Sequence, residues 1–171
     1  TASGTVMVKD INSGSGSSTP HSRNVLNDSA HIGNTFYFAA DDGSNGVELW
    51  KSDGTSSGTV MVKDINVSGN SYPGDLTVVG NTLYFTAFDG NGKELWKSDG
   101  TASGTVMVKD INSGSGDSWA SNFVVLGNTL FFTANDGTNG KELWKSDGTT
   151  SGTVMVKDIN SGSTGSSPRD L

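Results

Sequence analysis

The octapeptide ELWKSDGT occurs three times without a change, at residues 48–55, 94–101 and 142–149. A second phrase, GTVMVKDIN, occurs four times and starts at residues 4, 58, 104 and 152. Successive copies of this phrase are therefore 54, 46 and 48 residues apart. Periods of this size are typical of solenoids, propellers and other arrays in which each unit packs against its neighbours. The repeat constrains the fold of this chain more than any other feature.

One repeat unit contains four short apolar runs, at residues 76–79, 83–88, 93–97 and 105–111. The intervening dipeptides are Gly-Asn, Asp-Gly and Asn-Gly, which supply the positive φ angles that hairpin turns require. Each unit is therefore predicted to form four strands in an antiparallel meander.

Apolar side chains on both faces of the second strand indicate how the sheets pack. This strand reads Phe-Tyr-Phe, Leu-Tyr-Phe or Leu-Phe-Phe in the three copies, whereas a strand with one wet face alternates apolar and polar residues. A four-stranded sheet covered on both faces by copies of itself is a propeller blade. The predicted fold is all-β, a β-propeller or propeller fragment with a period of about 46–48 residues. A β-solenoid is the rival, with shorter repeats and parallel strands.

The same packing explains the unchanged octapeptide. Leu49, Leu95 and Leu143 are predicted to point to one face of the third strand, and Trp50, Trp96 and Trp144 to the other, each toward a neighbouring blade. Ser-Asp-Gly-Thr then forms the turn, with Asp accepting hydrogen bonds from nearby N–H groups and Gly supplying the unusual dihedral. A buried Glu, at positions 48, 94 and 142, needs a partner, and a lysine of an adjacent strand is the expected one.

The repeat divides the chain into five segments. Residues 1–12 are predicted to be a lone outer strand, the fourth of an incomplete blade, with the strand itself over residues 4–12. Blade 1 with an inserted loop covers 13–66, blade 2 covers 67–112, blade 3 covers 113–160, and residues 161–171 start a further blade. The expectation is an excerpt of a longer array, or a ring closed by several chains. Exposed blade faces and strand edges would favour self-association.

Composition excludes several classes of function. The chain has no cysteine, so disulfides, zinc–thiolate sites and thiol nucleophiles are ruled out. Its net charge of −7 argues against binding of nucleic acid or anionic lipid through a basic patch. The sequence contains no apolar stretch long enough for a membrane-spanning helix, so we expect neither nucleic acid as a partner nor membrane insertion.

The motif ELWKSDGTxSGTVMVKDIN resembles the bacterial ELWxxDGT repeat family. Residues 38–43 (FAADDG) and 46–50 (GVELW) fit the family pattern closely, as do the two later copies. The resemblance covers nearly the whole chain, although the usual Pro-Gly after the Ile is replaced by Ser-Gly or Val-Ser-Gly. It implies propeller-like units in a long, secreted or surface-attached bacterial protein, and it implies no shared activity.

An insertion in the first blade is the clearest departure from the repeat. Residues 20–35 align with 73–82 but are six residues longer, and they hold both histidines, His21 and His31, with Arg23 and Asp28. Nucleophile, base and acid are nominally present together with Ser22 and Ser29, as in a hydrolytic triad. No nucleophile elbow accompanies them, so a tolerated loop or a binding insertion is the favoured interpretation. Two His and one Asp would also suit a transition-metal ion.

The loop between the second and third strands is a candidate calcium site. It carries Asp41 and Asp42 in the first copy, Asp89 in the second and Asp136 in the third. Carboxylate and amide oxygens suit calcium, but the loop supplies at most two carboxylates, and an Asx-type hairpin turn explains it completely. No cofactor is therefore predicted, with calcium as the alternative.

Aromatic side chains are the candidate ligand-binding residues. The repeated tryptophans Trp50, Trp96 and Trp144 could stack on sugar rings, or they could simply pack between blades. Trp119 lies outside the repeated phrase, aligns with Tyr72 and sits in a polar linker, so it is expected to be more exposed.

These observations favour a non-enzymatic structural or adhesive repeat module of an extracellular or cell-surface bacterial protein, which mediates protein or surface interactions. The alternative is a glycan-binding, lectin-like propeller with a site in each blade and carbohydrate as its partner. Exposed tryptophans would favour the lectin, and buried tryptophans the scaffold. An enzyme is not expected, because no acid, base or nucleophile constellation recurs.

Overall fold

The computed structural model describes residues 2–18, 29–169 and 171, and it is an all-β structure built from three four-stranded antiparallel sheets. A single turn of 3₁₀-helix, η1 (Ala2–Gly4), precedes the strands. The strands are β1 (Ser29–Ile32), β2 (Thr35–Asp41), β3 (Val47–Ser52), β4 (Val60–Lys63), β5 (Gly74–Val79), β6 (Thr82–Phe88), β7 (Lys93–Ser98), β8 (Val106–Lys109), β9 (Ser121–Leu126), β10 (Thr129–Asn135), β11 (Lys141–Ser146) and β12 (Val154–Lys157).

Each sheet is one repeat unit with its strands in sequence order. We call β1–β4 sheet 1, β5–β8 sheet 2 and β9–β12 sheet 3. All neighbouring strands within a sheet are antiparallel. The prediction of three four-stranded antiparallel meanders is therefore confirmed.

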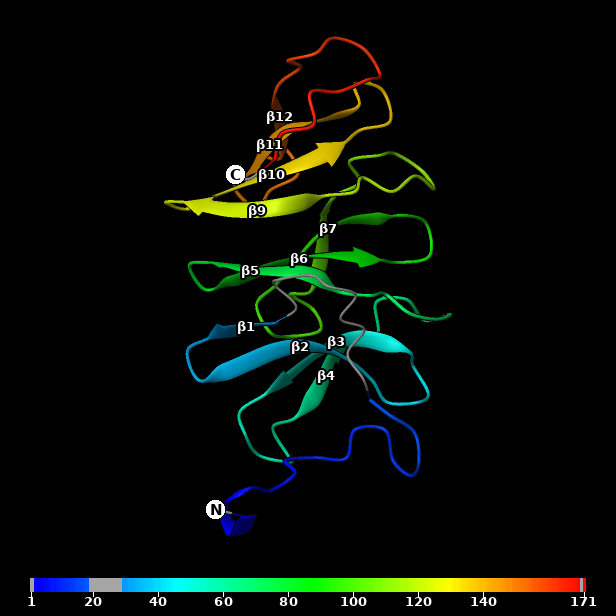
Figure 1. Ribbon diagram of the computed structural model, residues 1–171, viewed down its shortest axis with the longest axis vertical. Coiled ribbons are helices and arrows are strands. Elements are labelled where there is room, and N and C mark those ends of the chain that lie inside the picture. Colours follow the sequence, from blue (N-terminus) through cyan, green and yellow to red (C-terminus); the bar gives the residue numbers. More distant parts are fainter. Residues whose placement is uncertain (1, 19–28, 170) are drawn as a thin grey trace.

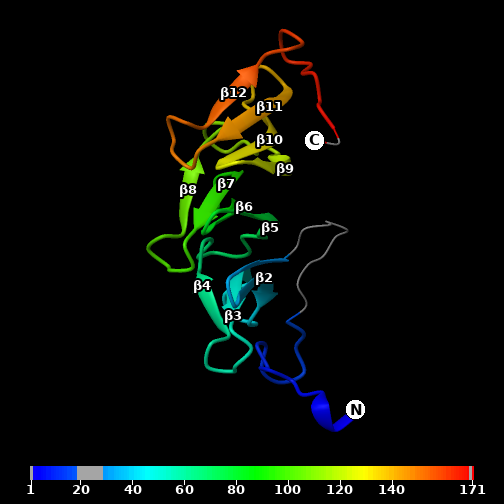
Figure 2. The same ribbon diagram turned by 90° about the vertical axis from the view of Figure 1, so that its left-hand side faces the viewer.

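The three sheets stack face to face along the long axis of the molecule (Figure 1). Seen from the side, the fourth strands β4, β8 and β12 run along one side of the stack, and β5 and β9 lie on the opposite side (Figure 2). At this second side β5 contacts β1 of the sheet below and β9 of the sheet above. Each unit thus meets its neighbours through corresponding elements, so one junction repeats the other.

A bulge recurs at the same place in every sheet. The register between the third and fourth strands shifts between Leu49 and Trp50 in sheet 1, and at the equivalent residues of sheets 2 and 3. Trp96 is thereby paired with Met107, while Leu95 is paired with Lys109. A bulge bends the strand and increases its twist, and here it sets the direction in which the fourth strand leaves the sheet.

The hydrophobic core lies between the sheets. One cluster joins sheets 1 and 2 and includes Leu49, Leu83, Phe85 and Trp96. The other joins sheets 2 and 3 and includes Leu95, Leu130, Phe132 and Trp144. Since Leu95 belongs to one cluster and Trp96 to the other, adjacent side chains of β7 do point to opposite neighbours, as the sequence predicted.

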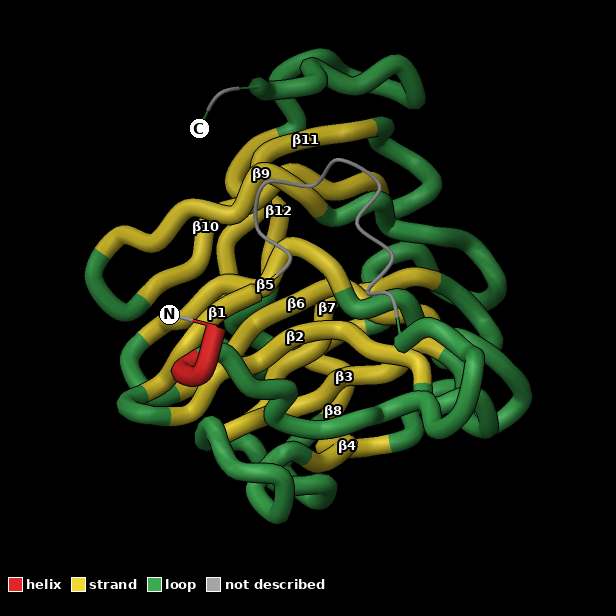
Figure 3. Tube along the Cα trace, turned by 60° about the horizontal axis from the view of Figure 1, so that its bottom comes forward, coloured by secondary structure: helices red, strands yellow, loops and turns green. Residues whose placement is uncertain are grey.

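The predicted strand over residues 4–12 is not formed. This segment begins in η1 and continues as loop (the helical turn and the loop after it are seen in Figure 3). In the three complete units the same residues, Val-Met-Val-Lys, form a strand because a third strand pairs with them. Residues 4–12 have no such neighbour among the described residues, which is the physical reason for the difference.

Candidate functional site: the junction between repeat units

Every junction uses a lysine from one unit and a tryptophan from the next. Lys63 Nζ of β4 lies 5.9 Å from the centre of the Trp96 ring and donates a hydrogen bond to Thr105 O at 2.9 Å. Lys109 makes the same two contacts with Trp144 and Thr153, at 5.8 and 2.9 Å. A cation at this distance from an indole face is attracted by the ring quadrupole. The lysine therefore fixes the fourth strand of one unit to the following sheet.

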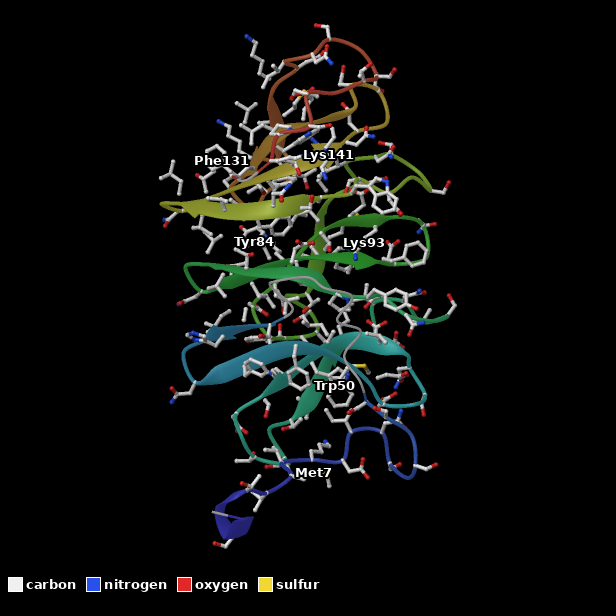
Figure 4. The ribbon with its side chains drawn as sticks, viewed as in Figure 1. Met7, Trp50, Tyr84, Lys93, Phe131 and Lys141 are labelled. Carbon is white, nitrogen blue, oxygen red and sulfur yellow. The ribbon has the colours of Figure 1, made fainter. Side chains whose placement is uncertain are left out.

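The N-terminal segment reproduces this contact without being a strand. Lys9 Nζ lies 5.9 Å from the Trp50 ring and donates to Thr59 O at 2.7 Å. Residues around Lys9 thus occupy the place that a preceding unit's fourth strand would take. In Figure 4, Trp50 lies on the N-terminal side of sheet 1, with Met7 below it.

The turn of the octapeptide is the second contact surface. Asp99 Oδ1 accepts hydrogen bonds from the N–H and hydroxyl of Thr101, at 2.8 and 2.7 Å, and Gly100 adopts a φ of 88°. Both predicted features of this turn are confirmed. The bared backbone of Gly100 lets the Tyr37 hydroxyl of sheet 1 approach so closely that a Cβ on Gly100 would collide with it. Lys51 of sheet 1 also donates to Gly100 O at 2.7 Å.

The second junction repeats this arrangement. Tyr84 lies against Gly148, and Lys97 Nζ donates to Gly148 O at 2.8 Å. Burial raises the pKa of Tyr84, and the negative charge of Asp147 raises it further. Burial, followed by the charge of Asp99, raises the pKa of Tyr37 in the same way. Both phenols are therefore held in their neutral form well above physiological pH.

A polar cleft of ≈ 400 Å³ lies between the first two turns. Tyr37 and Lys51 line it from sheet 1, together with Asp53, and Asp99 lines it from sheet 2. Hydrogen bonds from the hydroxyl and N–H of Thr101 hold the pKa of Asp99 below its usual value. The carboxylate is already engaged in its own turn, so the cleft is a consequence of how the turns stack.

The third element of the junction is a buried carboxylate that clasps the linker between units. Glu48 Oε2 accepts hydrogen bonds from Ile65 N–H at 2.9 Å and the Ser71 hydroxyl at 2.6 Å, and Oε1 accepts from Ser71 N–H at 3.0 Å. Ser71 also donates its N–H to Val47 O and accepts from Phe88 N–H of sheet 2. One serine therefore connects β3 of one unit to β6 of the next.

The expected lysine partner of this glutamate is wrong. Backbone N–H groups and a serine satisfy the carboxylate instead, as they do for Glu94 with Ile111 and Ser118 and for Glu142 with Ile159 and Ser166. The lysines are engaged elsewhere, on the tryptophan of the next sheet. Sequence reasoning missed the serine, although its fixed distance of 23 or 24 residues after the glutamate is visible in all three copies.

The three glutamates differ in acidity because their surroundings differ. Burial raises the pKa of Glu94 to about 7, against the opposing hydrogen bonds from Ile111, Ser118 and Asn112. Burial raises the pKa of Glu48 as well. Burial acts on Glu142 too, but the hydrogen bonds from Ser166 outweigh it, and the pKa of this carboxyl lies below its usual value.

The candidate calcium loops are occupied by their own hydrogen bonds. Asp42 accepts from the N–H groups of Ser44 and Asn45 and from the Asn45 amide, and Asp136 does the same with Thr138 and Asn139. Asp41 accepts from Gly43 N–H and Asp89 from Asn91 N–H. In the described residues no three His, Asp or Glu side chains come close enough together to hold a metal ion.

The four candidate tryptophans fall into two groups. Trp50, Trp96 and Trp144 are buried, with 5–6% of their surface exposed, whereas Trp119 is 63% exposed. The indole N–H groups of the three buried residues have no hydrogen-bond partner, which leaves ring packing and the lysine contact as their interactions. Trp119 and the aligned Tyr72 both adopt positive φ, 51° and 47°.

The insertion of the first blade lies mainly outside the described residues. His21, Ser22, Arg23 and Asp28 belong to the part that the structure does not describe. Ser29 and His31 lie on β1 and are exposed. The structure therefore brings together no part of the predicted triad or metal site.

The described residues include no helix that is long and apolar enough to cross a membrane. Comparison with known proteins finds no family model, no curated protein and no solved structure that matches this chain.

Proposed function

We propose that this chain is a non-enzymatic structural repeat module whose units form propeller-type blades, and that it mediates protein or surface interactions. The observation that carries the proposal is the repetition of one set of contacts at both junctions. Lysine on tryptophan, tyrosine on glycine and glutamate on serine all recur with nearly the same geometry. The most unusual side chains of the repeat are thus engaged in stacking the units.

The arrangement of the sheets supports propeller blades in particular. The first strands of the three sheets contact one another, and the fourth strands follow one outer side of the stack (Figure 2). Four-stranded meanders arranged with the first strand innermost and the fourth outermost are the blades of a propeller. The resemblance to the bacterial ELWxxDGT repeats agrees with this assignment, and it extends the proposal to an extracellular or cell-surface location.

Glycan binding is the second candidate function, and one observation favours it. Trp119 and Tyr72 expose 63% and 43% of their surface at corresponding positions of two linkers, in a backbone conformation that side chains rarely adopt. Strained backbone at an exposed aromatic residue is typical of functional positions. A sugar ring would stack on these two residues, because the three buried tryptophans offer no free face.

A glycan array probed once with calcium and once with chelator tests both candidates. Absence of binding under both conditions is expected for the structural module. Binding that survives chelation and is lost in Trp119→Ala would establish the lectin instead. Binding that disappears with chelator would overturn the assignment of the Asp-Gly loops as simple turns.

A further inference from the structure

The two ends of the stack present different surfaces. We call the face of a sheet that carries the lysines, such as Lys51 and Lys63 of sheet 1, its lysine face. The opposite face, with the tryptophan and the octapeptide turn, is its tryptophan face. At both junctions the lysine face of one sheet meets the tryptophan face of the next.

The lysine face of sheet 3 is open in the described part of the chain. Val62 and Val108, at equivalent positions in sheets 1 and 2, are 6% and 3% exposed, but Val156 of sheet 3 is 46% exposed. Ile65 and Ile111 are 8% and 5% exposed, and Ile159 is 59% exposed. Figure 4 shows Tyr84 between sheets 2 and 3 and its counterpart Phe131 beyond sheet 3. The same residues that are core at two junctions are surface at this end.

The tryptophan face of sheet 1 is half covered. A Cβ on Gly54 would meet no atom within 4 Å, whereas the equivalent Gly100 and Gly148 lie against a tyrosine hydroxyl. The turn of sheet 1 therefore lacks its tyrosine and its lysine. Trp50 and Thr59 O, in contrast, already hold Lys9.

We propose that the lysine face of sheet 3 binds the tryptophan face of sheet 1 of a second copy of this chain, head to tail, with the Lys9 segment as a removable cover. Lys157 of one copy replaces Lys9 of the other on Trp50 and Thr59 O. Lys145 then donates to Gly54 O, as Lys97 does to Gly148 O. Position 56 of the second copy meets Val156 O, as Thr150 Oγ1 meets Val108 O at 2.8 Å.

The exchange is favourable because the lysine contact is conserved while new surface is buried. One lysine leaves the tryptophan and an equivalent lysine takes its place, so no ionic or hydrogen-bonding group loses its partner. Val156, Ile159 and Phe131 lose contact with water, which stabilises the assembly in proportion to the apolar area removed. A contact between two different faces does not close on itself in a dimer, so it produces rings or open filaments.

A pair of complementary variants tests this inference, which rests on the proposed stacking role of the repeat. Ile159→Asp places a charge on the lysine face of sheet 3 and leaves sheet 1 intact. Ser56→Arg places a bulky cation on the tryptophan face of sheet 1, at an exposed residue, opposite the lysines of the incoming copy. Val67→Asp, at an 86% exposed linker residue outside both faces, is the matched control.

Analytical ultracentrifugation over a range of concentrations gives the readout. The parent chain and Val67→Asp are expected to form a concentration-dependent series of oligomers, and each blocked variant alone is expected to lose every species above the monomer. An equimolar mixture of Ile159→Asp and Ser56→Arg is expected to form a dimer and nothing larger, because one intact face remains on each copy. A parent chain that stays monomeric, or a mixture without dimer, would overturn the inference.

Two further readouts keep the test decisive. Equal melting temperatures of the parent and both blocked variants exclude misfolding, and Lys145→Glu is the second blocking variant if Ile159→Asp unfolds. The stacking role itself is measured separately, by the stability of Trp96→Ala. If Trp96→Ala is strongly destabilised while the mixture stays monomeric, the module stands and the head-to-tail contact fails.

Discussion

Trp96 is the residue whose removal should cost the most stability. It is 6% exposed, packs in the core between sheets 1 and 2, and lies under Lys63. Trp96→Ala would leave a cavity between two sheets, and large-to-small changes of core aromatics cost about 3–5 kcal/mol. Chemical denaturation monitored by circular dichroism measures this loss.

Trp119→Ala is the control for this prediction. Trp119 is 63% exposed, so its removal should change the free energy of unfolding little. If Trp96→Ala were as stable as Trp119→Ala, the packing role of the octapeptide would be wrong.

Glu94 should make the protein more stable in weak acid. Its pKa is raised to about 7 in the folded state by burial, while an unfolded chain has the ordinary value near 4.5. Between these two values the unfolded state releases a proton that the folded state retains, so stability falls as the pH rises through this window. Below pH 4.5 both states are protonated, and the contribution is fully present.

Urea denaturation at pH 8 and pH 5 measures this effect. The parent chain is expected to gain more stability from acidification than Glu94→Gln, which cannot titrate. Glu142→Gln is the counterpart with the opposite sign, because the pKa of Glu142 is lowered and its contribution is lost on acidification. Identical pH dependence in the parent chain and Glu94→Gln would show that Glu94 does not titrate in this range.

At the scale of the element, the octapeptide turn offers a matched comparison. Gly54 and Gly100 both have a φ of 88°, yet only Gly100 lies against a tyrosine of the preceding sheet. Gly54→Ala should cost the backbone strain alone, roughly 1–2 kcal/mol. Gly100→Ala should cost clearly more, because the new methyl group collides with the Tyr37 hydroxyl.

Thermal unfolding of both variants measures the difference, and Tyr37→Phe in the Gly100→Ala background should recover part of the loss. Equal destabilisation of the two glycine variants would show that the tyrosine contact does not constrain the junction.

The elements themselves were largely predictable from local chemistry. Short apolar runs between Asp-Gly and Gly-Asn turns gave the meander, and the alternation of Leu95 and Trp96 gave the two faces of β7. The partner of Glu94 was not predictable in this way, because Ser118 comes from a linker that only the stacked arrangement brings to the carboxylate. The strand expected at 4–12 failed for a related reason, since strand formation depends on a pairing partner and not on the sequence of one segment.

At the scale of the whole molecule, the middle sheet should be the most protected. Sheet 2 is covered by a sheet on each face, and Phe85 and Leu95 are fully buried. In repeat proteins each unit is stabilised by its contacts with its neighbours, so units with fewer contacts open first. Hydrogen exchange measured by mass spectrometry should therefore find the slowest amides in β6 and β7, and faster exchange in β11 and β12.

Uniform protection of sheets 2 and 3 would contradict this order of opening. The measurement is best made at a concentration where the parent chain is monomeric, because head-to-tail association would also protect β12.

The junctions all run in one direction, from the lysine of one unit to the tryptophan of the next, and this has a consequence for how such chains can change in length. Duplication or loss of one complete unit within the gene leaves every remaining boundary with the same pair of surfaces, so the new product needs no compensating substitution. A lineage can thus lengthen or shorten the array in whole steps by recombination between near-identical copies, and the unchanged ELWKSDGT phrase both permits that recombination and survives it.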